Sequence, residues 1–299
     1  MYSSQLTRKT LTVDGGSISY LCSEPNVHPL NIHLFHATGF NAQTYRQILE
    51  PLSEHFNVYA SDLRGHGKSD AQADPTQFHS WDIYRQDFYH LLDSINQPIY
   101  LIGHSVGSII SIAGACERPD IVKGLILTEP LMYPPAAQLL MSQSHAESNP
   151  MVIGARKRRA LFPSKQEMVE NYIGKGAFKT WPRSWIEDYV DGGSRKLASG
   201  EVRLSCEPEW EAKSFQVAEI TPWDQIAKLQ CPTTILYGAS GFSTCSPLGV
   251  EKYVELHPET RVIQDSEASH FLPMENPQLV IDEVVKMAFE PSQGTLVSA

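Results

Sequence analysis

Residues 99–112 read Ile99-Tyr100-Leu101-Ile102-Gly103-His104-Ser105-Val106-Gly107-Ser108-Ile109-Ile110-Ser111-Ile112, a glycine-flanked serine between two apolar runs. The pattern G-x-S-x-G in this position predicts a buried strand that turns sharply into a helix. Glycine at 103 and 107 suits a turn so tight that side chains two residues before and after Ser105 would not fit. The Ser105 hydroxyl is therefore expected at the exposed tip of the turn, beside the free N–H groups of the helix.

A serine hydroxyl is a weak nucleophile, so chemistry at Ser105 needs a histidine to take its proton and a carboxylate to orient that histidine. His270 lies in residues 268–273, between the last predicted strand and the last predicted helix. Such a loop can return a side chain to the carboxyl edge of a parallel sheet. We expect Ser105 as nucleophile and His270 as base, whereas the plainer interpretation is a surface serine and a surface histidine.

The composition is that of an ordinary globular protein. The chain has 299 residues and a formal net charge of −10. This acidic balance argues against nucleic acid or an anionic membrane as the main partner and favours a small-molecule substrate. Nothing in the sequence indicates an oligomeric state.

The cysteines and the first residues bear on the compartment. The cysteines are odd in number and show no C-x-x-C spacing, which predicts free thiols and a reducing environment: Cys22, Cys116, Cys206, Cys231 and Cys245. Residues 1–9 lack the apolar core of a signal peptide, and no apolar run reaches membrane-spanning length. We therefore predict a cytoplasmic protein without membrane insertion.

Short apolar runs alternate with longer amphipathic stretches, which predicts an α/β protein with a mostly parallel sheet. After a hairpin over 11–21, the expected strands are 32–35, 58–61, 99–102, 124–128, 233–237 and 260–263. Between about 133 and 222 there are no strand-like runs but helical patterns, including 166–173 and 185–190. We expect this segment to be a helical insertion that covers the sheet. A helix over 278–289 closes the chain, and residues from Glu290 are expected to fray.

Three further motifs accompany the serine motif: His36-Ala37-Thr38-Gly39-Phe40, Asp62-Leu63-Arg64-Gly65-His66-Gly67-Lys68-Ser69 and Ser269-His270-Phe271-Leu272-Pro273. With them the sequence resembles the α/β-hydrolase fold family over nearly its whole length. More narrowly it is similar to a poorly characterised bacterial branch, in residues 155–159, 162–163 and 203–208. The resemblance implies a mostly parallel eight-stranded sheet with a helical cap after strand six. The implied core is 1–131 and 223–299, and the implied cap is 132–222.

The acid departs from the commonest family pattern. Members usually carry an aspartate shortly after the seventh strand, but residues 238–245 contain no carboxylate. Glu129 ends the sixth strand, where some branches place their acid. A carboxylate that closes a buried strand is costly unless it has a partner such as an imidazole. We predict Glu129 as the acid, with Asp265 and Asp62 as alternatives, and a strand-end cap as the plainer role for Glu129.

The resemblance also implies an oxyanion hole made by the N–H groups of Val106 and Thr38. The family usually has glycine where this chain has Ala37, so either Ala37 or Thr38 could present the second donor. His36 is expected to anchor its loop, and His104 to pack or hydrogen-bond locally.

The predicted activity is that of a cofactor-independent serine hydrolase, a carboxylesterase that cleaves small to medium esters through an acyl-enzyme. No metal is expected because His33 and His36 lack a third ligand, and no nucleotide-binding glycine motif occurs. One alternative is a carbon–carbon bond hydrolase of ring-cleavage products, with the basic run Arg156-Lys157-Arg158-Arg159 holding a substrate carboxylate. That run could equally be a solvated helix face. The other alternative is a non-catalytic ligand-binding protein of the same fold.

Overall fold

A computed structural model describes residues 6–24, 27–134, 148–218 and 221–290. Its centre is an eight-stranded sheet in the order β1-β2-β4-β3-β5-β6-β10-β11. The strands are β1 (Thr7–Val13), β2 (Gly16–Cys22), β3 (Asn31–Phe35), β4 (Asn57–Ser61), β5 (Ile99–His104), β6 (Val122–Thr128), β10 (Thr233–Gly238) and β11 (Arg261–Asp265). β1 and β2 pair antiparallel, β2 also runs antiparallel to β4, and every other pairing in this sheet is parallel. The predicted fold class is confirmed.

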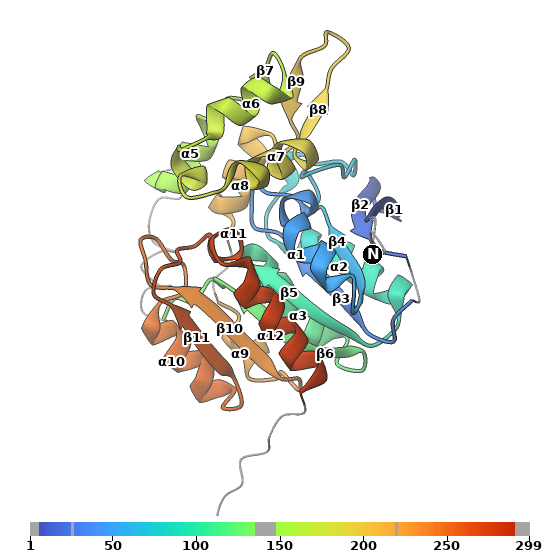
Figure 1. Ribbon diagram of the computed structural model, residues 1–299, viewed down its shortest axis with the longest axis vertical. Helices are drawn as coiled ribbons and strands as arrows, with labels where there is room; N and C mark the ends of the chain where they lie inside the picture. Colours follow the sequence, from blue (N-terminus) through green and yellow to red (C-terminus); the bar gives the residue numbers. More distant parts are fainter. Residues whose placement is uncertain (1–5, 25–26, 135–147, 219–220, 291–299) are drawn as a thin grey trace, which may run out of the picture.

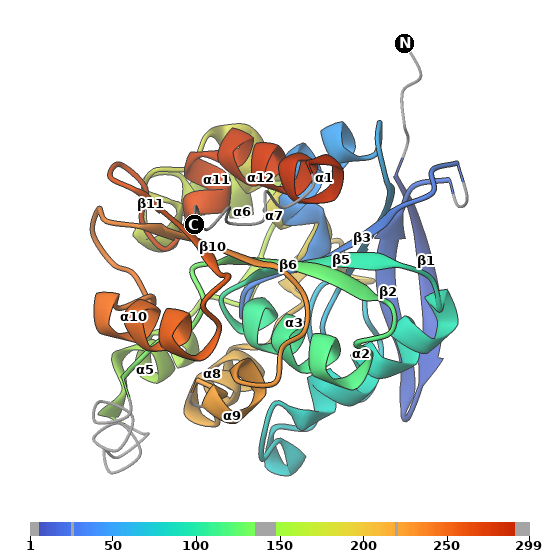
Figure 2. The same ribbon diagram turned by 90° about the horizontal axis from the view of Figure 1, so that it is seen from below.

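Helices cover both faces of the sheet (Figure 2). On one face lie α1 (Arg46–Leu52) and α12 (Pro277–Phe289), which contact each other, with the short α11 (Leu272–Glu275) before α12. On the other face lie α2 (Asp82–Ile95), α3 (Val106–Glu117), α9 (Trp223–Ile226) and α10 (Pro247–Leu256). The sheet is therefore the middle layer of three.

Alternating side chains of the central strands enter two separate cores, because successive residues of a strand point to opposite faces. Leu101 and Leu127 pack into the cluster beneath α2 and α3, whereas Ile102 and Ile126 pack into the cluster beneath α1 and α12. All four side chains are almost completely buried. Strands buried on both faces read as continuous apolar runs, which is why the sequence revealed them.

Residues 148–218, between β6 and α9 in the chain, form a layer above the carboxyl edge of the sheet (Figure 1). It contains the helices α5 (Pro150–Arg156), α6 (Lys165–Tyr172), α7 (Arg183–Gly192) and α8 (Pro208–Gln216). It also contains a small antiparallel sheet of β7 (Leu161–Phe162), β8 (Ser194–Lys196) and β9 (Val202–Leu204). The expectation of an insertion without strands is wrong, because strands of two or three residues are too short to show alternation.

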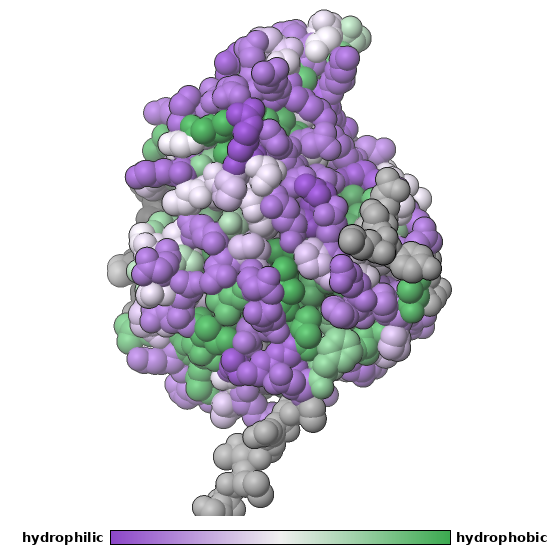
Figure 3. Space-filling model, in the orientation of Figure 1, coloured by the Kyte–Doolittle hydropathy of each residue, from purple (hydrophilic) through white to green (hydrophobic). Residues whose placement is uncertain are grey.

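The surface agrees with the acidic, polar composition. Hydrophilic residues cover most of the face shown in Figure 3, with apolar patches between them. Within the described residues, no helix is both long and apolar enough to cross a bilayer. The expected fraying beyond Glu290 concerns residues outside the described part of the chain.

Candidate active site

Ser105 occupies the turn between β5 and α3 in a backbone conformation that L residues rarely adopt, with φ 56° and ψ −117°. The turn closes because glycines stand on both sides. A Cβ on Gly103 would lie 2.5 Å from the backbone of Gly107, and a Cβ on Gly107 would lie 2.6 Å from Phe35 Cβ. Strain of this kind persists where the surroundings enforce it, and it is common at functional sites.

The loop after β3 and the start of α3 supply the two expected oxyanion donors. The N–H of Ala37 already donates to Tyr45 Oη at 3.1 Å. In the part of the chain that the structure describes, the N–H groups of Thr38 and Val106 have no hydrogen-bond acceptor. Val106 is the first residue of α3, where the N–H has no partner within the helix. The geometry therefore leaves Thr38 rather than Ala37 with the free donor.

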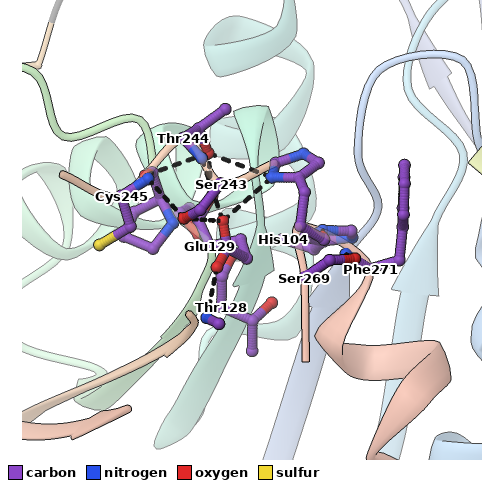
Figure 4. A network of polar contacts seen from close by, with 12 residues as sticks. His104, Thr128, Glu129, Ser243, Thr244, Cys245, Ser269 and Phe271 are labelled. Atoms are coloured by element: carbon purple, nitrogen blue, oxygen red, sulfur yellow. Dashed lines mark hydrogen bonds and ion pairs between the residues drawn. The ribbon is translucent and has the colours of Figure 1, made fainter. Parts of the chain in front are cut away.

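Glu129 directly follows β6 and is fully buried. Its backbone is also left-handed, with φ 48°. The carboxylate accepts hydrogen bonds from the N–H of Gly238 at 2.6 Å, Ser243 Oγ at 2.7 Å and the N–H of Thr244 at 3.1 Å. Figure 4 shows the carboxylate at the centre of this network. A buried charge is costly unless it is paired and hydrogen-bonded, and the end of β10 and the loop after it supply the donors.

His270, at the end of the loop between β11 and α11, points one ring nitrogen at this cluster. Its Nδ1 lies 3.2 Å from Glu129 Oε2 and 3.2 Å from Thr244 Oγ1. The Thr244 hydroxyl donates to the Glu129 carbonyl at 2.8 Å, so it can accept from His270 Nδ1–H. The structure thus brings His270 and Glu129 together, and it adds Thr244 as a second acceptor.

Neither alternative acid contacts His270. Asp265 accepts from the N–H groups of Glu267 and Ala268 and from Asn276 Nδ2. These bonds, above all that from Asn276, lower the pKa of the Asp265 carboxyl. Asp62 is fully buried, pairs with Arg8 at 2.6 Å and accepts from the N–H groups of Ala42 and Lys68. Both carboxylates organise loops.

The histidines near the serine are held neutral by burial. The pKa of His36 is lowered to about 4 and that of His66 to about 3, chiefly by desolvation. His36 Nε2 accepts from the N–H of Leu63, and His66 Nε2 accepts from the N–H of Gly39. His36 therefore anchors its loop, as expected. His104 hydrogen-bonds to Tyr45 and to the carbonyl of His270.

Arg156, Lys157 and Arg159 of the basic run are exposed, as expected for a solvated face, whereas Arg158 is partly buried. Arg158 forms an ion pair with Glu211 and donates to Tyr189 Oη at 2.5 Å. Arg156, at the end of α5, pairs with Glu209, which lies on α8 as Glu211 does. Arg159 donates to the carbonyl of Leu161 at 2.8 Å. These three guanidinium groups are thus used within the insertion.

An aromatic wall stands next to His270. The ring of Phe271 lies 5.6 Å from that of His270, 6.3 Å from that of Phe40 and 5.9 Å from that of Trp181. Phe242 meets the His270 ring edge-on at 5.4 Å, and its side chain is 53% exposed. An apolar wall beside a polar centre is typical of small-molecule sites.

Sequence reasoning did not find Ser243, Thr244 or Tyr45. The signal for the first two was present, because residues 238–245 hold hydroxyl groups where the family usually has its acid. Hydroxyl groups there are what a carboxylate arriving from β6 needs as donors. No comparable signal marks Tyr45, whose position opposite His104 depends on the path of the loop.

Comparisons with known proteins agree with this architecture. The family model described as the alpha/beta hydrolase fold matches residues 32–277. The 2-(acetamidomethylene)succinate hydrolase of Mesorhizobium japonicum is 25% identical over 282 residues, covering 91% of this chain and 92% of that protein. The (E)-2-((N-methylformamido)methylene)succinate hydrolase of Acinetobacter baylyi is 22% identical over 278 residues, covering 91% and 94%.

Among solved structures, that of an E-2-(acetamidomethylene)succinate hydrolase matches with a TM-score of 0.79 at 18% identity, covering 95% of this chain and 99% of that one. The match extends along the whole sheet and its insertion, so it is not limited to the serine motif. Together with the family model, it shows that this chain belongs to the α/β-hydrolase fold family.

Proposed function

We propose that this protein is a cofactor-independent serine hydrolase, with Ser105 as nucleophile, His270 as general base and acid, and Glu129 as the orienting carboxylate. The observation that carries the proposal is the contact of 3.2 Å between His270 Nδ1 and Glu129 Oε2. Support comes from the strained backbone of Ser105 and from the unbonded N–H groups of Thr38 and Val106.

In the proposed reaction, Ser105 Oγ attacks the carbonyl carbon while His270 Nε2 takes the hydroxyl proton. Thr38 and Val106 donate to the oxygen that gains negative charge. The carbon–oxygen bond to the leaving group breaks, and His270 returns the proton to the departing alcohol. Water then attacks the acyl-enzyme with His270 again as base, which releases the acid and restores Ser105.

We propose a carboxylic ester of small to medium size as the substrate. An ester has a good leaving group and demands little beyond the triad and the oxyanion hole. The aromatic wall of Phe40, Trp181 and Phe271 supports an apolar group on one side of the scissile bond.

The second candidate is a hydrolase of carboxylate-bearing amides, or of carbon–carbon bonds in ring-cleavage products. It is favoured by the two relatives, whose names specify N-acylated derivatives of aminomethylenesuccinate, a dicarboxylate. Against it stands the basic run, because Arg156 and Arg158 are paired with Glu209 and Glu211.

The test combines labelling with turnover. Folded protein is treated with a fluorophosphonate, and the modified residue is located by mass spectrometry. Ser105→Ala and heat-denatured protein are the controls. Stoichiometric label on Ser105 is the expected result. A folded protein that takes up no label would instead favour the hypothesis of a non-catalytic ligand-binding protein.

Hydrolysis is then measured on p-nitrophenyl esters from acetate to decanoate and on N-acylated aminomethylene dicarboxylates. Turnover confined to neutral esters is expected. Labelling of Ser105 together with turnover only of the dicarboxylates would replace the esterase by the second candidate.

A further inference from the structure

Three buried hydrogen bonds connect the loop that holds Thr38 with the loop that holds His270. The N–H of Ala37 and Tyr45 Oη are 3.1 Å apart, Tyr45 Oη and His104 Nδ1 are 2.6 Å apart, and His104 Nε2 and the carbonyl oxygen of His270 are 2.7 Å apart. Tyr45 and His104 are each 1% exposed. Solvent therefore does not substitute for any of these bonds.

With a neutral imidazole at His104, only one arrangement of protons satisfies all three bonds. The amide N–H of Ala37 is a donor, so Tyr45 Oη accepts it and directs its own proton to His104 Nδ1. The carbonyl of His270 is an acceptor, so His104 must carry its proton on Nε2. Burial, with a smaller contribution from His270, holds the pKa of His104 well below the usual range and so favours the neutral ring. In this neutral ring Nδ1 is the acceptor and Nε2 the donor.

Each end of this series of hydrogen bonds involves a part of the proposed active site. At one end, the bond to Tyr45 occupies the N–H of Ala37 and leaves that of Thr38 free. At the other end, His104 fixes the main chain of His270, whose ring faces Glu129. His104 also adjoins Ser105 directly in the sequence.

We infer that Tyr45 and His104 form a positioning relay that sets the oxyanion loop and the catalytic histidine relative to Ser105. This inference rests on the proposed function for its effect on rate. The structural part of the inference is that Tyr45 enforces the Nε2–H tautomer of His104. This part does not depend on the proposed function. An error of about 1 Å in such an arrangement can cost on the order of a hundredfold in rate.

The first measurement is the tautomer itself, read in the resting protein from the ¹⁵N shifts of the His104 imidazole at pH 7.5. A pyridine-type Nδ1 and a protonated Nε2 are expected. In Tyr45→Phe, which lacks only the hydroxyl, the Nδ1 shift should change while the protein stays folded. A protonated Nδ1 in the wild type would overturn the relay whatever the enzyme assays give.

The second measurement is kinetic, with p-nitrophenyl acetate as the probe. Tyr45→Phe should lower kcat about tenfold and leave KM within about twofold, because positioning acts on the transition state. Tyr253→Phe, which removes a hydroxyl buried in the opposite core cluster, is the matched control and should keep its kcat. An equal loss of kcat in Tyr45→Phe and Tyr253→Phe would show that Tyr45 contributes only to packing and has no positioning role.

Two substitutions of His104 distinguish the effect of its hydrogen-bond donor from the effect of its side-chain volume. His104→Gln offers an amide N–H near the position of Nε2, whereas His104→Met has similar size and no donor. His104→Gln should retain at least several times the kcat of His104→Met at equal thermal stability. Equal rates in the two variants would overturn the role of the bond to His270. If the wild type hydrolyses no ester, the ¹⁵N result still decides the relay, and the proposed function fails separately.

Discussion

Glu129 Oε2 lies 3.2 Å from His270 Nδ1, although 141 positions separate the two residues in the chain. Glu129 reaches this point from the end of β6 in a left-handed conformation, and three donors from the end of β10 and the segment after it hold its carboxylate. Among the described residues, only Asn96, Ser105 and Glu129 combine a side chain with positive φ. Two of these three are the proposed nucleophile and the proposed acid. Backbone strain and chemistry thus coincide at both ends of the proposed triad.

Glu129→Gln tests the acid. An amide cannot carry the charge that stabilises a protonated His270, so kcat on p-nitrophenyl acetate should fall by about 10³ to 10⁴. Asp265→Asn is the matched control, because Asp265 contacts backbone N–H groups and Asn276 instead of His270. Circular dichroism checks that both variants fold. If Asp265→Asn loses the greater share of kcat, the acid is misassigned.

A pair of substitutions at Thr244 tests the second acceptor of His270 Nδ1–H. Thr244→Val has nearly the same shape but removes the hydroxyl that lies between His270 and the Glu129 carbonyl. We expect kcat to fall about 5-fold to 30-fold, the range for one lost hydrogen bond of about 1–2 kcal/mol. Thr244→Ser keeps the hydroxyl and should remain within about threefold of the wild type. Similar kcat values in Val and Ser variants would show that Glu129 alone orients His270.

The parts of the candidate site that could be proposed from the sequence are those whose signal is local. The turn at Ser105 is encoded by two glycines and two apolar runs, and the structure shows why a Cβ at either glycine would collide. Glu129 could be proposed because a carboxylate at the end of a buried strand needs a partner, and because the usual acid position is empty of carboxylates.

Other parts depend on tertiary contacts that no local pattern reports. Tyr45 meets His104 across 59 positions, and Arg158 meets Glu211 across 53. The basic run was open to interpretation as a substrate-binding or solvated feature, because charge alone does not reveal burial. The short strands β7, β8 and β9 could not be predicted for a different reason. They are too short to show an alternation of apolar and polar residues, and they form because they pair with one another.

Arg158→Met should destabilise the insertion strongly. The substitution leaves Glu211 without its cationic partner, and the side chain of Glu211 is only 9% exposed. Breaking a buried ion pair from one side costs about 3–5 kcal/mol. The free energy of unfolding in urea measures the loss. The double variant Arg158→Met/Glu211→Met should recover much of it, whereas two costs that simply add would show that the residues are not coupled.

Stability should fall steeply as the pH drops below about 6.5, because four fully buried histidines resist protonation in the folded state. Burial lowers the pKa of His33 to about 3, of His36 to about 4 and of His66 to about 3, and it holds the pKa of His104 well below the usual range. The unfolded chain, with histidine pKa values near 6.5, binds protons that the folded protein excludes, so the lost stability grows until the folded pKa is reached.

The free-energy cost of keeping these histidines unprotonated decides at which pH the protein unfolds. His33, His36 and His66 each cost about 2 kcal/mol at pH 5, and together about 6 kcal/mol, out of a total that is typically about 5–15 kcal/mol. Because His104 also resists protonation, urea unfolding between pH 8 and 5 should show a slope of up to four protons. His33→Leu should remove up to one proton from that slope, with exposed His55→Gln as the control. A free energy of unfolding that stays level from pH 7 to pH 5 would mean that these side chains accept protons without unfolding.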